Sequence, residues 1–201
     1  MRHVEGIRLI GLSGLKSSGK DTVGRYLADR YGFETISFAA SLKASASALF
    51  GIDPSAWESM KNDPDATVTL VGETPPYEGS SQISMTARKF LQRYGTEAHR
   101  GVFGEDFWVN ALFDPLDMDG RNLGKRYAIT DVRFPDEHVA VHDRGGIVVR
   151  IERLTDDHSD THASETLPGY DLVDWIIRND GTFQDLYDEV DRVIRVEESR
   201  I

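Results

Sequence analysis

The segment from Gly14 to Thr22, with the sequence GLKSSGKDT, constrains the fold of this chain more than any other segment. It follows the apolar run of residues 7–12 and precedes a stretch with helical spacing. A strand that turns through glycines into a helix aims several backbone N–H groups and the positive end of the helix dipole at one anion. Lys20 adds a full positive charge there. The segment therefore predicts a phosphate-binding loop between a first strand and a first helix.

The spacing of Gly14, Gly19 and Lys20 fits the loop that binds nucleoside triphosphates. That pattern continues with Ser or Thr, whereas this chain has Asp21, with Thr22 one position later. A hydroxyl at this point normally ligates a magnesium ion. We therefore expect either the carboxylate of Asp21 or the hydroxyl of Thr22 to contact Mg²⁺, and the sequence leaves both open.

Length and charge restrict the class of protein. A chain of 201 residues is long enough to bury the core of one domain. Its 34 acidic and 23 basic residues give a formal net charge of −11, which repels a nucleic-acid backbone and argues against nucleic-acid binding. The absence of cysteine excludes disulfides, thiolate catalysis and Cys-ligated zinc. No stretch is apolar for long enough to be a secretion signal or to span a bilayer, so we expect a soluble, cytoplasmic protein without membrane contact.

Strand-like and helical stretches alternate along most of the chain. Helical spacing continues from the loop to Tyr31, and Gly32 is expected to end that helix in a left-handed conformation. Further strands are expected at 34–38, 127–131, 146–151 and 172–177, and further helices at 39–50 and from about 183 to about 195. This alternation predicts a parallel sheet covered by helices on both faces, a three-layer α/β/α fold.

Residues 53–84 interrupt this alternation. They contain four prolines and two glycines, so we expect an irregular, mobile insertion. Ser84 is the expected N-cap of the helix that follows, and Gly95 its expected end. The apolar face of this helix consists of Ala87, Phe90, Leu91 and Tyr94.

Charged residues follow the strand expected at 127–131. Ligands of parallel sheets bind outside the carboxyl ends of the strands. Asp131 lies at such an end, where a carboxylate can hold the water shell of magnesium or simply cap a helix. Arg133 lies two residues further and points along the same face if the strand continues. Its planar guanidinium could bind two oxygens of a phosphoryl group.

Four more residues are candidates for contacts with an anionic ligand. Lys16 lies inside the loop, where a second cation beside Lys20 is unfavourable unless an anion intervenes. Lys43 and Arg88 lie at the starts of helical segments, where a cation opposes the helix dipole, so each is a phosphate contact or an ordinary surface charge. Trp108 could stack on a base or belong to the core.

His158 and His162 suggest a different chemistry. They are four residues apart among several aspartates, a spacing that would place two metal ligands on one face of a helix. The segment lacks apolar periodicity, however, so a solvated acidic loop is the better interpretation.

Four motifs together resemble the phage-type deoxynucleoside monophosphate kinases, a branch of the P-loop kinases. The motifs are GLKSSGKDT at 14–22, LQRYGTE at 91–97, FWV at 107–109 and TDVRFPDE at 130–137, and residues 162–165 and 179–182 are consistent with them. The resemblance extends from the first strand to the last and leaves only 53–84 unmatched. It implies a single P-loop kinase domain over 1–201, with a small helical insertion that binds the monophosphate at 53–110 and a lid at about 152–166.

The resemblance implies that the γ-phosphoryl group of ATP is transferred, with Mg²⁺, to the 5′-phosphate of a deoxynucleoside monophosphate. Catalytic roles would fall to Lys20, Arg133 and Lys16, and ATP would be bound by Gly14, Ser17, Ser18, Gly19, Lys20, Asp21, Thr22, Asn179 and Gly181. The acceptor site would comprise Lys16, Arg88, Gly95, Thr96, Trp108, Asp131, Arg133 and Glu137, with Lys43 added on the dipole argument. The metal candidates are Asp21, Thr22 and Asp131. Arg150 and Arg153 precede the expected lid. Phosphoryl transfer depends on positioning and cations, so we expect no protein nucleophile and no obligatory general base.

Three alternatives remain at the level of sequence. One is an animal-type phosphomevalonate kinase, which shares the Gly-Lys-Asp element and also has a phosphate monoester as acceptor; Trp108 and Gly95-Thr96 favour a nucleotide instead. The others are a non-catalytic ATP-binding switch and a hydrolase built on His158 and His162. The sequence does not fix which deoxynucleotides are accepted or how many subunits assemble, a homo-oligomer included.

Overall fold

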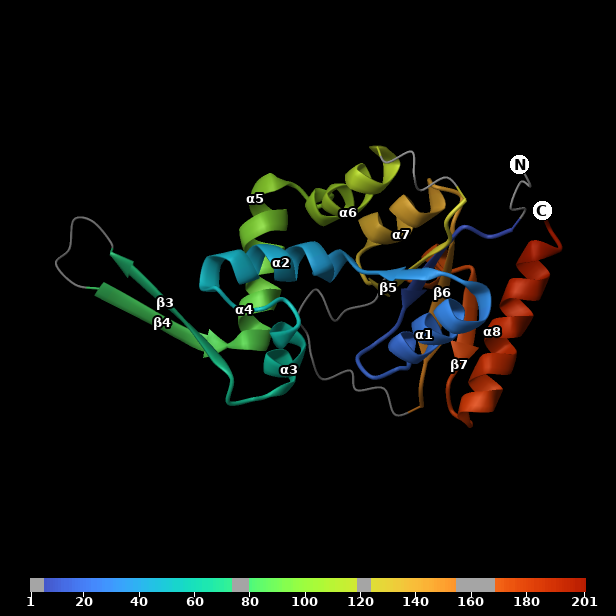
Figure 1. Cartoon of the computed structure of the whole chain (residues 1–201), viewed down its shortest axis with the longest axis horizontal. Helices are drawn as coiled ribbons and strands as arrows, with labels where there is room; N and C mark the ends of the chain where they lie inside the picture. Colours follow the sequence, from blue (N-terminus) through green and yellow to red (C-terminus); the bar gives the residue numbers. More distant parts are fainter. Residues whose placement is uncertain (1–5, 74–79, 119–123, 155–168) are drawn as a thin grey trace. The chain divides into compact units, whose positions relative to one another are not determined.

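Figure 1 shows the computed structural model of the chain, which describes residues 6–73, 80–118, 124–154 and 169–201. The chain forms two compact units. The first consists of Met1–Ala39 together with Glu105–Ile201, and the second of Ala40–Gly104. The assignment of 53–110 as a monophosphate-binding insertion within one domain stays a prediction.

The first unit is built on a five-stranded sheet with the order β2-β5-β1-β6-β7. The strands are β1 (Leu9–Ser13), β2 (Glu34–Ile36), β5 (Tyr127–Val132), β6 (Ile147–Glu152) and β7 (Trp175–Arg178). All neighbouring pairs are parallel, which confirms the predicted sheet. Every residue of the central strand β1 is buried, as expected for a parallel strand covered on both faces.

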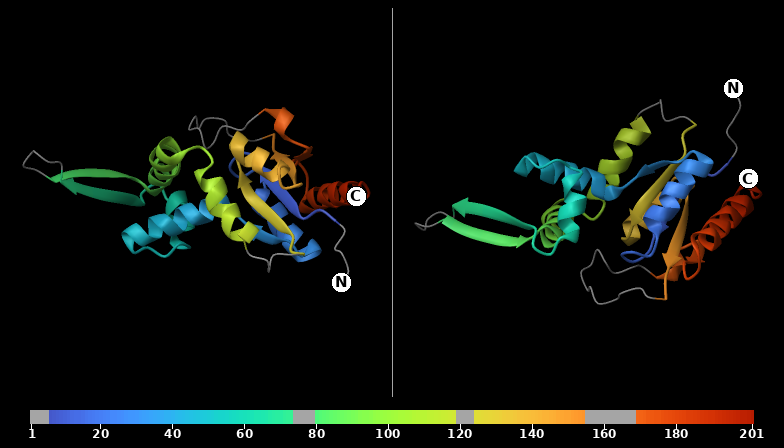
Figure 2. Two further views of the ribbon diagram at one scale, coloured as in Figure 1. Left: turned by 90° about the horizontal axis from the view of Figure 1, so that it is seen from above. Right: turned by 60° about the horizontal axis from the view of Figure 1, so that its bottom comes forward.

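Helices cover both faces of this sheet. On one face, α1 (Lys20–Tyr31) and α8 (Phe183–Glu198) lie side by side, as the blue and red helices of Figure 2 show, and share one apolar core with β1, β6 and β7. On the other face, α6 (Phe107–Met118) and α7 (Pro135–His142) pack against β1, β5 and β6. The three-layer α/β/α prediction is therefore confirmed.

Several predicted boundaries hold and others move. Gly32 ends α1 with φ 70°, as expected for a left-handed cap. The strand expected at 34–38 stops at Ile36, because Phe38 already begins helix α2 (Phe38–Phe50). The last strand begins at Trp175 because residues Tyr170–Leu172 form the short helix η4. In the described ranges, no helix is long and apolar enough to cross a membrane.

The second unit combines helices with a hairpin. After α2 come α3 (Ala56–Asn62), the antiparallel strands β3 (Thr67–Glu73) and β4 (Ser80–Thr86), and then α4 (Ala87–Arg93), η1 (Tyr94–Arg100) and α5 (Gly101–Phe103). Its core is aromatic: Trp57 is fully buried, with its ring 5.8 Å from that of Phe90. The indole N–H of Trp57 donates a hydrogen bond of 2.9 Å to the hydroxyl of Ser47, so the buried polar group is satisfied.

The prediction of an irregular segment at 53–84 was wrong. The segment contains α3 and most of the hairpin. Pro54 and Pro64 lie just outside the two ends of α3, where they bound the helix without interrupting it. Proline content therefore marked element ends and was mistaken for a lack of elements.

The helix expected at 84–95 also differs at both ends. Its N-cap is Thr86, whose hydroxyl accepts a hydrogen bond from the backbone N–H of Lys89, while Ser84 belongs to the hairpin. It continues beyond Gly95 through the π-helix η1 and then α5. Gly95 does not adopt a positive φ, whereas Gly104 has φ 111° and follows the last helical residue.

Candidate functional site

The loop between β1 and α1 has the backbone of an anion-binding turn. Gly14 has φ 144°, Ser17 has φ 64° and Gly19 has φ 114°. Positive φ values at these three positions reverse the chain and can turn backbone N–H groups towards one side of the loop. The loop leads directly into α1 at Lys20, so the helix N-terminus lies at its end.

Two glycines of this loop are required by close packing. A Cβ at Gly14 would lie 2.4 Å from the carbonyl oxygen of Ile151 in β6. A Cβ at Gly19 would lie 2.4 Å from Nδ2 of Asn179, which follows β7. The loop is thus seated on the carboxyl ends of two neighbouring strands, the edge at which ligands of parallel sheets bind.

Lys20 and Ser18 bring polar groups into the loop. The ammonium of Lys20 donates hydrogen bonds of 2.8 Å to the carbonyl of Gly14 and of 2.6 Å to that of Leu15, and the side chain is only 8% exposed. The hydroxyl of Ser18 is buried and has no hydrogen-bond partner in the part of the chain that the structure describes. The ammonium of Lys20 inside the loop fits a phosphate group, which would accept hydrogen bonds from it.

The oxygen atoms next to the loop fit magnesium. Asp21 is exposed in the first turn of α1, and Thr22 is half-buried beside it. Magnesium at nucleotide sites uses one or two protein oxygens and completes its shell with phosphate and water. Within the described residues, no group of three or more His, Asp or Glu side chains could hold a metal ion by itself. Asp21 and Thr22 therefore fit a metal that arrives with a nucleotide.

Asp131 is fully engaged with backbone. Its Oδ1 accepts a hydrogen bond of 2.9 Å from the N–H of Phe38, and its Oδ2 one of 2.9 Å from the N–H of Ala39. The carboxylate thus caps the N-terminus of α2, which was one of its two expected roles. Its role as a metal or substrate contact stays a prediction.

Glu137 is likewise held by backbone. Its Oε2 accepts hydrogen bonds of 2.7 Å from the N–H of Arg133 and of 3.1 Å from that of Phe134, and the residue is only 3% exposed. The carboxylate therefore fixes the turn between β5 and α7. Arg133 is half-buried on this turn, so Glu137 sets the backbone from which the guanidinium extends.

The segment after β7 contacts the loop as well. The carboxamide of Asn179 donates a hydrogen bond of 2.8 Å from Nδ2 to the carbonyl of Ser18. Arg153, just after β6, donates 3.1 Å to the carbonyl of Asn179 and 3.4 Å to that of Ser17. Gly181 is exposed, and a Cβ there would lie 2.6 Å from Oδ2 of Asp185, the residue that completes the capping box of α8. No pattern in the sequence predicts the contact between Asn179 and Ser18.

Trp108 lies in α6 with only 5% of its surface exposed, and its ring meets that of Phe107 edge to face at 4.8 Å. Stacking on a base would need an uncovered ring face, so this role of Trp108 stays a prediction.

Four predicted acceptor contacts belong to the second unit. Lys43 forms an ion pair of 2.8 Å with Glu58, which also pairs with Lys61 at 2.8 Å. Burial pushes the pKa of Glu58 upward, but the hydrogen bonds and charges of the two lysines lower it to about 2. Sequence analysis did not identify Glu58. Arg88 donates to Asn62 at 3.3 Å, and Gly95 and Thr96 lie in η1.

The structure thus brings residues 14–22 together with Asn179, and gathers Asp131, Arg133 and Glu137 at the end of β5. His158 and His162 lie outside the described residues, as does most of the lid expected at about 152–166.

Comparison with known proteins identifies related sequences and folds. The family model described as "Deoxynucleotide monophosphate kinase" matches residues 61–190. A protein of Acanthamoeba polyphaga mimivirus, named a deoxynucleotide monophosphate kinase, is 30% identical over 200 residues, covering 90% of this chain and 93% of the relative. The deoxynucleotide monophosphate kinase of Enterobacteria phage T4 is 24% identical and covers 94% of this chain and 100% of the relative. A solved structure from Chloroflexus aurantiacus, described as a kinase, is 12% identical with a TM-score of 0.51 and covers 96% of this chain and 99% of the other.

Proposed function

Because this chain belongs to the deoxynucleotide monophosphate kinase family, we propose that residues 14–22 hold the triphosphate of ATP and that the end of β5 faces the acceptor. The chain is an ATP-dependent kinase whose acceptor is a deoxynucleoside monophosphate. An oxygen of the acceptor's 5′-phosphate forms a bond to the γ-phosphorus, the bond from that phosphorus to the β–γ bridging oxygen breaks, and ADP leaves with the electron pair. No group is transferred to the protein in this scheme.

Lys20 is the proposed central catalytic residue. Its ammonium already lies inside the loop, held by the carbonyls of Gly14 and Leu15. When a triphosphate is bound, the same ammonium can offset the charge that develops on the transferring group. Lys16 is exposed on the loop and is free of the packing that confines Lys20, which supports its proposed reach towards the acceptor phosphate.

Magnesium is proposed to bind with ATP through Asp21 or Thr22. When bound, the ion would offset part of the negative charge of the triphosphate. Asp131 uses both oxygens for the backbone of α2, so we assign it a contact with the water shell of the metal instead of direct ligation.

The acceptor phosphate is proposed to meet the guanidinium of Arg133, whose backbone Glu137 fixes. We further propose that Trp108 contacts the acceptor base, and that Arg88, Gly95, Thr96 and Lys43 bind the acceptor nucleotide. Lys43 would exchange its carboxylate partner Glu58 for a phosphate oxygen when the substrate binds. Gly181 is proposed to lie on the adenine side of ATP, whereas Asn179, which donates a hydrogen bond to Ser18, is assigned to the loop.

Two broader expectations accompany this function. The net charge of −11 supports small nucleotides as partners and disfavours nucleic acid. Nucleotide substrates also favour the cytoplasm as the location, or the host cytoplasm if a phage encodes the chain.

The observation that carries the proposal is the insertion of the Lys20 ammonium into a glycine-rich loop at a helix N-terminus. The test is an ADP-release assay with ATP, Mg²⁺ and a panel of deoxynucleoside and isoprenoid monophosphates. We expect ADP release only with deoxynucleoside monophosphates, in a 1:1 ratio to the diphosphate product. Turnover with an isoprenoid phosphate, or ATP binding without any turnover, would contradict the proposal.

The matching variants are Lys20→Ala and Lys125→Ala. Lys125 precedes β5 at the opposite end of the sheet, where it pairs with Glu34. We expect Lys20→Ala to lower kcat by about 10²–10³-fold or more, since a cation aimed at the transferring group is lost. Lys125→Ala should leave kcat unchanged.

A further inference from the structure

We propose that Asn179 is a positioning residue for the triphosphate loop, acting through the Ser18–Gly19 peptide and not through the base of the nucleotide. The proposal rests on the assigned function of the loop. It concerns a contact 161 residues apart in sequence, between the segment after β7 and the turn before α1.

The contact is between buried groups. Asn179 is 6% exposed and Ser18 is fully buried, and Nδ2 of Asn179 lies 2.8 Å from the Ser18 carbonyl oxygen. Because a carbonyl can only accept, the NH₂ end of the carboxamide must face Ser18. A buried carbonyl that lost this donor would be left without a partner, which is unfavourable.

Peptide planarity transmits this contact to the ligand side. The carbonyl of Ser18 and the N–H of Gly19 belong to one trans peptide unit, so they point in opposite directions. Holding the Ser18 carbonyl against Asn179 therefore fixes the direction of the Gly19 N–H. Gly19 has φ 114° and no side chain, so the peptide before it could rotate easily without the brace.

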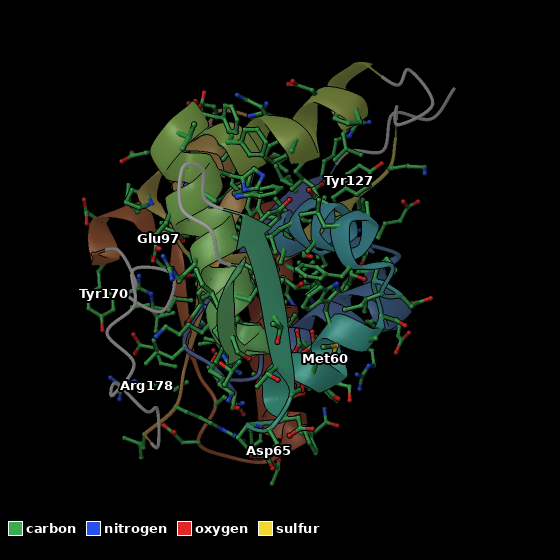
Figure 3. All side chains as sticks on the ribbon, turned by 90° about the vertical axis from the view of Figure 1, so that its left-hand side faces the viewer. Met60, Asp65, Glu97, Tyr127, Tyr170 and Arg178 are labelled. Carbon is green, nitrogen blue, oxygen red and sulfur yellow. The ribbon has the colours of Figure 1, made fainter. Side chains whose placement is uncertain are left out.

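Asn179 is itself firmly anchored to the sheet. Its N–H donates 2.7 Å to the carbonyl of Glu152, and its carbonyl accepts 3.1 Å from Nε of Arg153. It follows Arg178, the last residue of β7, which is labelled in Figure 3. The lack of a side chain at Gly19 leaves room for the carboxamide of Asn179, because a Cβ there would lie 2.4 Å from Nδ2.

The test measures binding of a ligand that has no base. Equilibrium affinities for ATP and for inorganic tripolyphosphate, both with Mg²⁺, are compared between wild type, Asn179→Leu and Asn179→Ala. Leu approximates the shape of Asn but has no hydrogen-bond donor. Ala is a second substitution in case Leu perturbs folding, and thermal unfolding shows whether each variant is folded. We expect each variant to bind both ligands about tenfold more weakly, by the same factor, because one buried donor to the loop is lost.

Asn110→Leu is the matched control. Asn110 is an exposed amide on α6 that donates 3.1 Å to Asp106, and its loss should change neither affinity. If Asn179→Leu and Asn179→Ala weakened ATP but not tripolyphosphate, Asn179 would act on the nucleoside, and the proposal would be overturned. Unchanged affinities for both ligands would overturn it as well. Failure of the proposed function is distinguishable, because the wild-type protein itself would then release no ADP with any deoxynucleoside monophosphate.

Discussion

Asp131, near the end of β5, accepts a hydrogen bond of 2.9 Å from the backbone N–H of Phe38, the first residue of α2. Its second oxygen accepts from Ala39 at the same distance. The first N–H groups of a helix have no partner within the helix, and a negative charge is favourable beside them. One carboxylate therefore joins the end of β5 to the first turn of α2.

Asp131→Ala should lower the free energy of unfolding by about 1–2 kcal/mol, because two backbone donors lose their acceptor. Urea titration followed by circular dichroism measures this change. Asp29→Ala removes a carboxylate from an exposed position of α1 and should stay within about 0.5 kcal/mol of wild type. A value for Asp131→Ala in that same range would show that the cap contributes little.

The ion pairs of Glu58 predict a specific acid dependence. Burial raises the pKa of this carboxyl, but Lys43 and Lys61 outweigh it and lower the pKa to about 2 from its ordinary value of 4.5. A carboxyl with a depressed folded-state pKa stabilises the fold above pH 4.5 and loses that contribution as the pH falls towards 2. The stability advantage of wild type over Glu58→Gln, measured by urea unfolding between pH 6 and pH 2, should therefore shrink across this interval. An advantage that stays constant with pH would contradict the assignment.

His138 predicts a second pH effect, of different origin. Its ring is fully buried in α7, and Nδ1 lies 2.8 Å from the carbonyl of Phe134, so the neutral ring carries its hydrogen on Nδ1. Burial lowers the pKa of His138, the charge of Arg150 lowers it further, and the hydrogen bond to Phe134 opposes both. The unfolded chain therefore takes up a proton that the folded chain does not, so stability falls as the pH drops below about 6.5.

NMR titration of the His138 ring should accordingly give a pKa below 6.5. In urea unfolding, wild type should lose more stability between pH 8 and pH 5 than His138→Gln. Titration of the folded ring at or above 6.5 would refute the predicted direction.

The loop glycines and the cap glycine should respond differently to a methyl group. Gly14→Ala would place Cβ 2.4 Å from the carbonyl oxygen of Ile151 at φ 144°, so the loop must shift, and we expect kcat/KM to fall by at least about tenfold. Gly32→Ala keeps a left-handed φ of 70° but meets nothing within 4 Å. It should lower the free energy of unfolding by about 1–2 kcal/mol and leave kcat/KM unchanged. Equal losses of activity in both variants would contradict the steric argument.

Local patterns predicted the part of the fold that local chemistry determines. Glycine spacing and helical periodicity identified the loop and α1, and the apolar run at 127–131 identified β5. The hairpin was missed although one of its faces is apolar, with Val68 opposite Met85 and Leu70 opposite Ile83, because the prolines and glycines of 53–84 outweighed this alternation. Prolines beside the ends of α3 strengthened the wrong interpretation.

The sequence predicts which residue types form the candidate site, but not which atoms those residues contact. The positions of Asp131 and Glu137 suggested roles towards a ligand, yet their oxygens are engaged by backbone N–H groups. The role of Glu58 could not be predicted from the sequence, because only the fold of the second unit places it beside Lys43. Asn179, after β7, contacts Ser18, which follows β1 two strands away in the sheet and 161 residues away in sequence, so no local sequence pattern encodes the contact.

The helices α4, η1 and α5 follow one another without a break, and the π-helix η1 determines which side of this continuous helix the later residues occupy. The buried residues Leu91 and Gly95 are four positions apart, as is usual on one side of an α-helix. The next buried residue, Arg100, follows Gly95 after five positions. The wider turn of the π-helix therefore accommodates one extra residue and keeps Gly95 and Arg100 on the same side. Deleting a single residue between Gly95 and Arg100 would restore the common pitch and keep Arg100 on the buried side, four positions after Gly95. A return to the common pitch without a deletion would instead turn Arg100 by about 100° around the axis, away from that side.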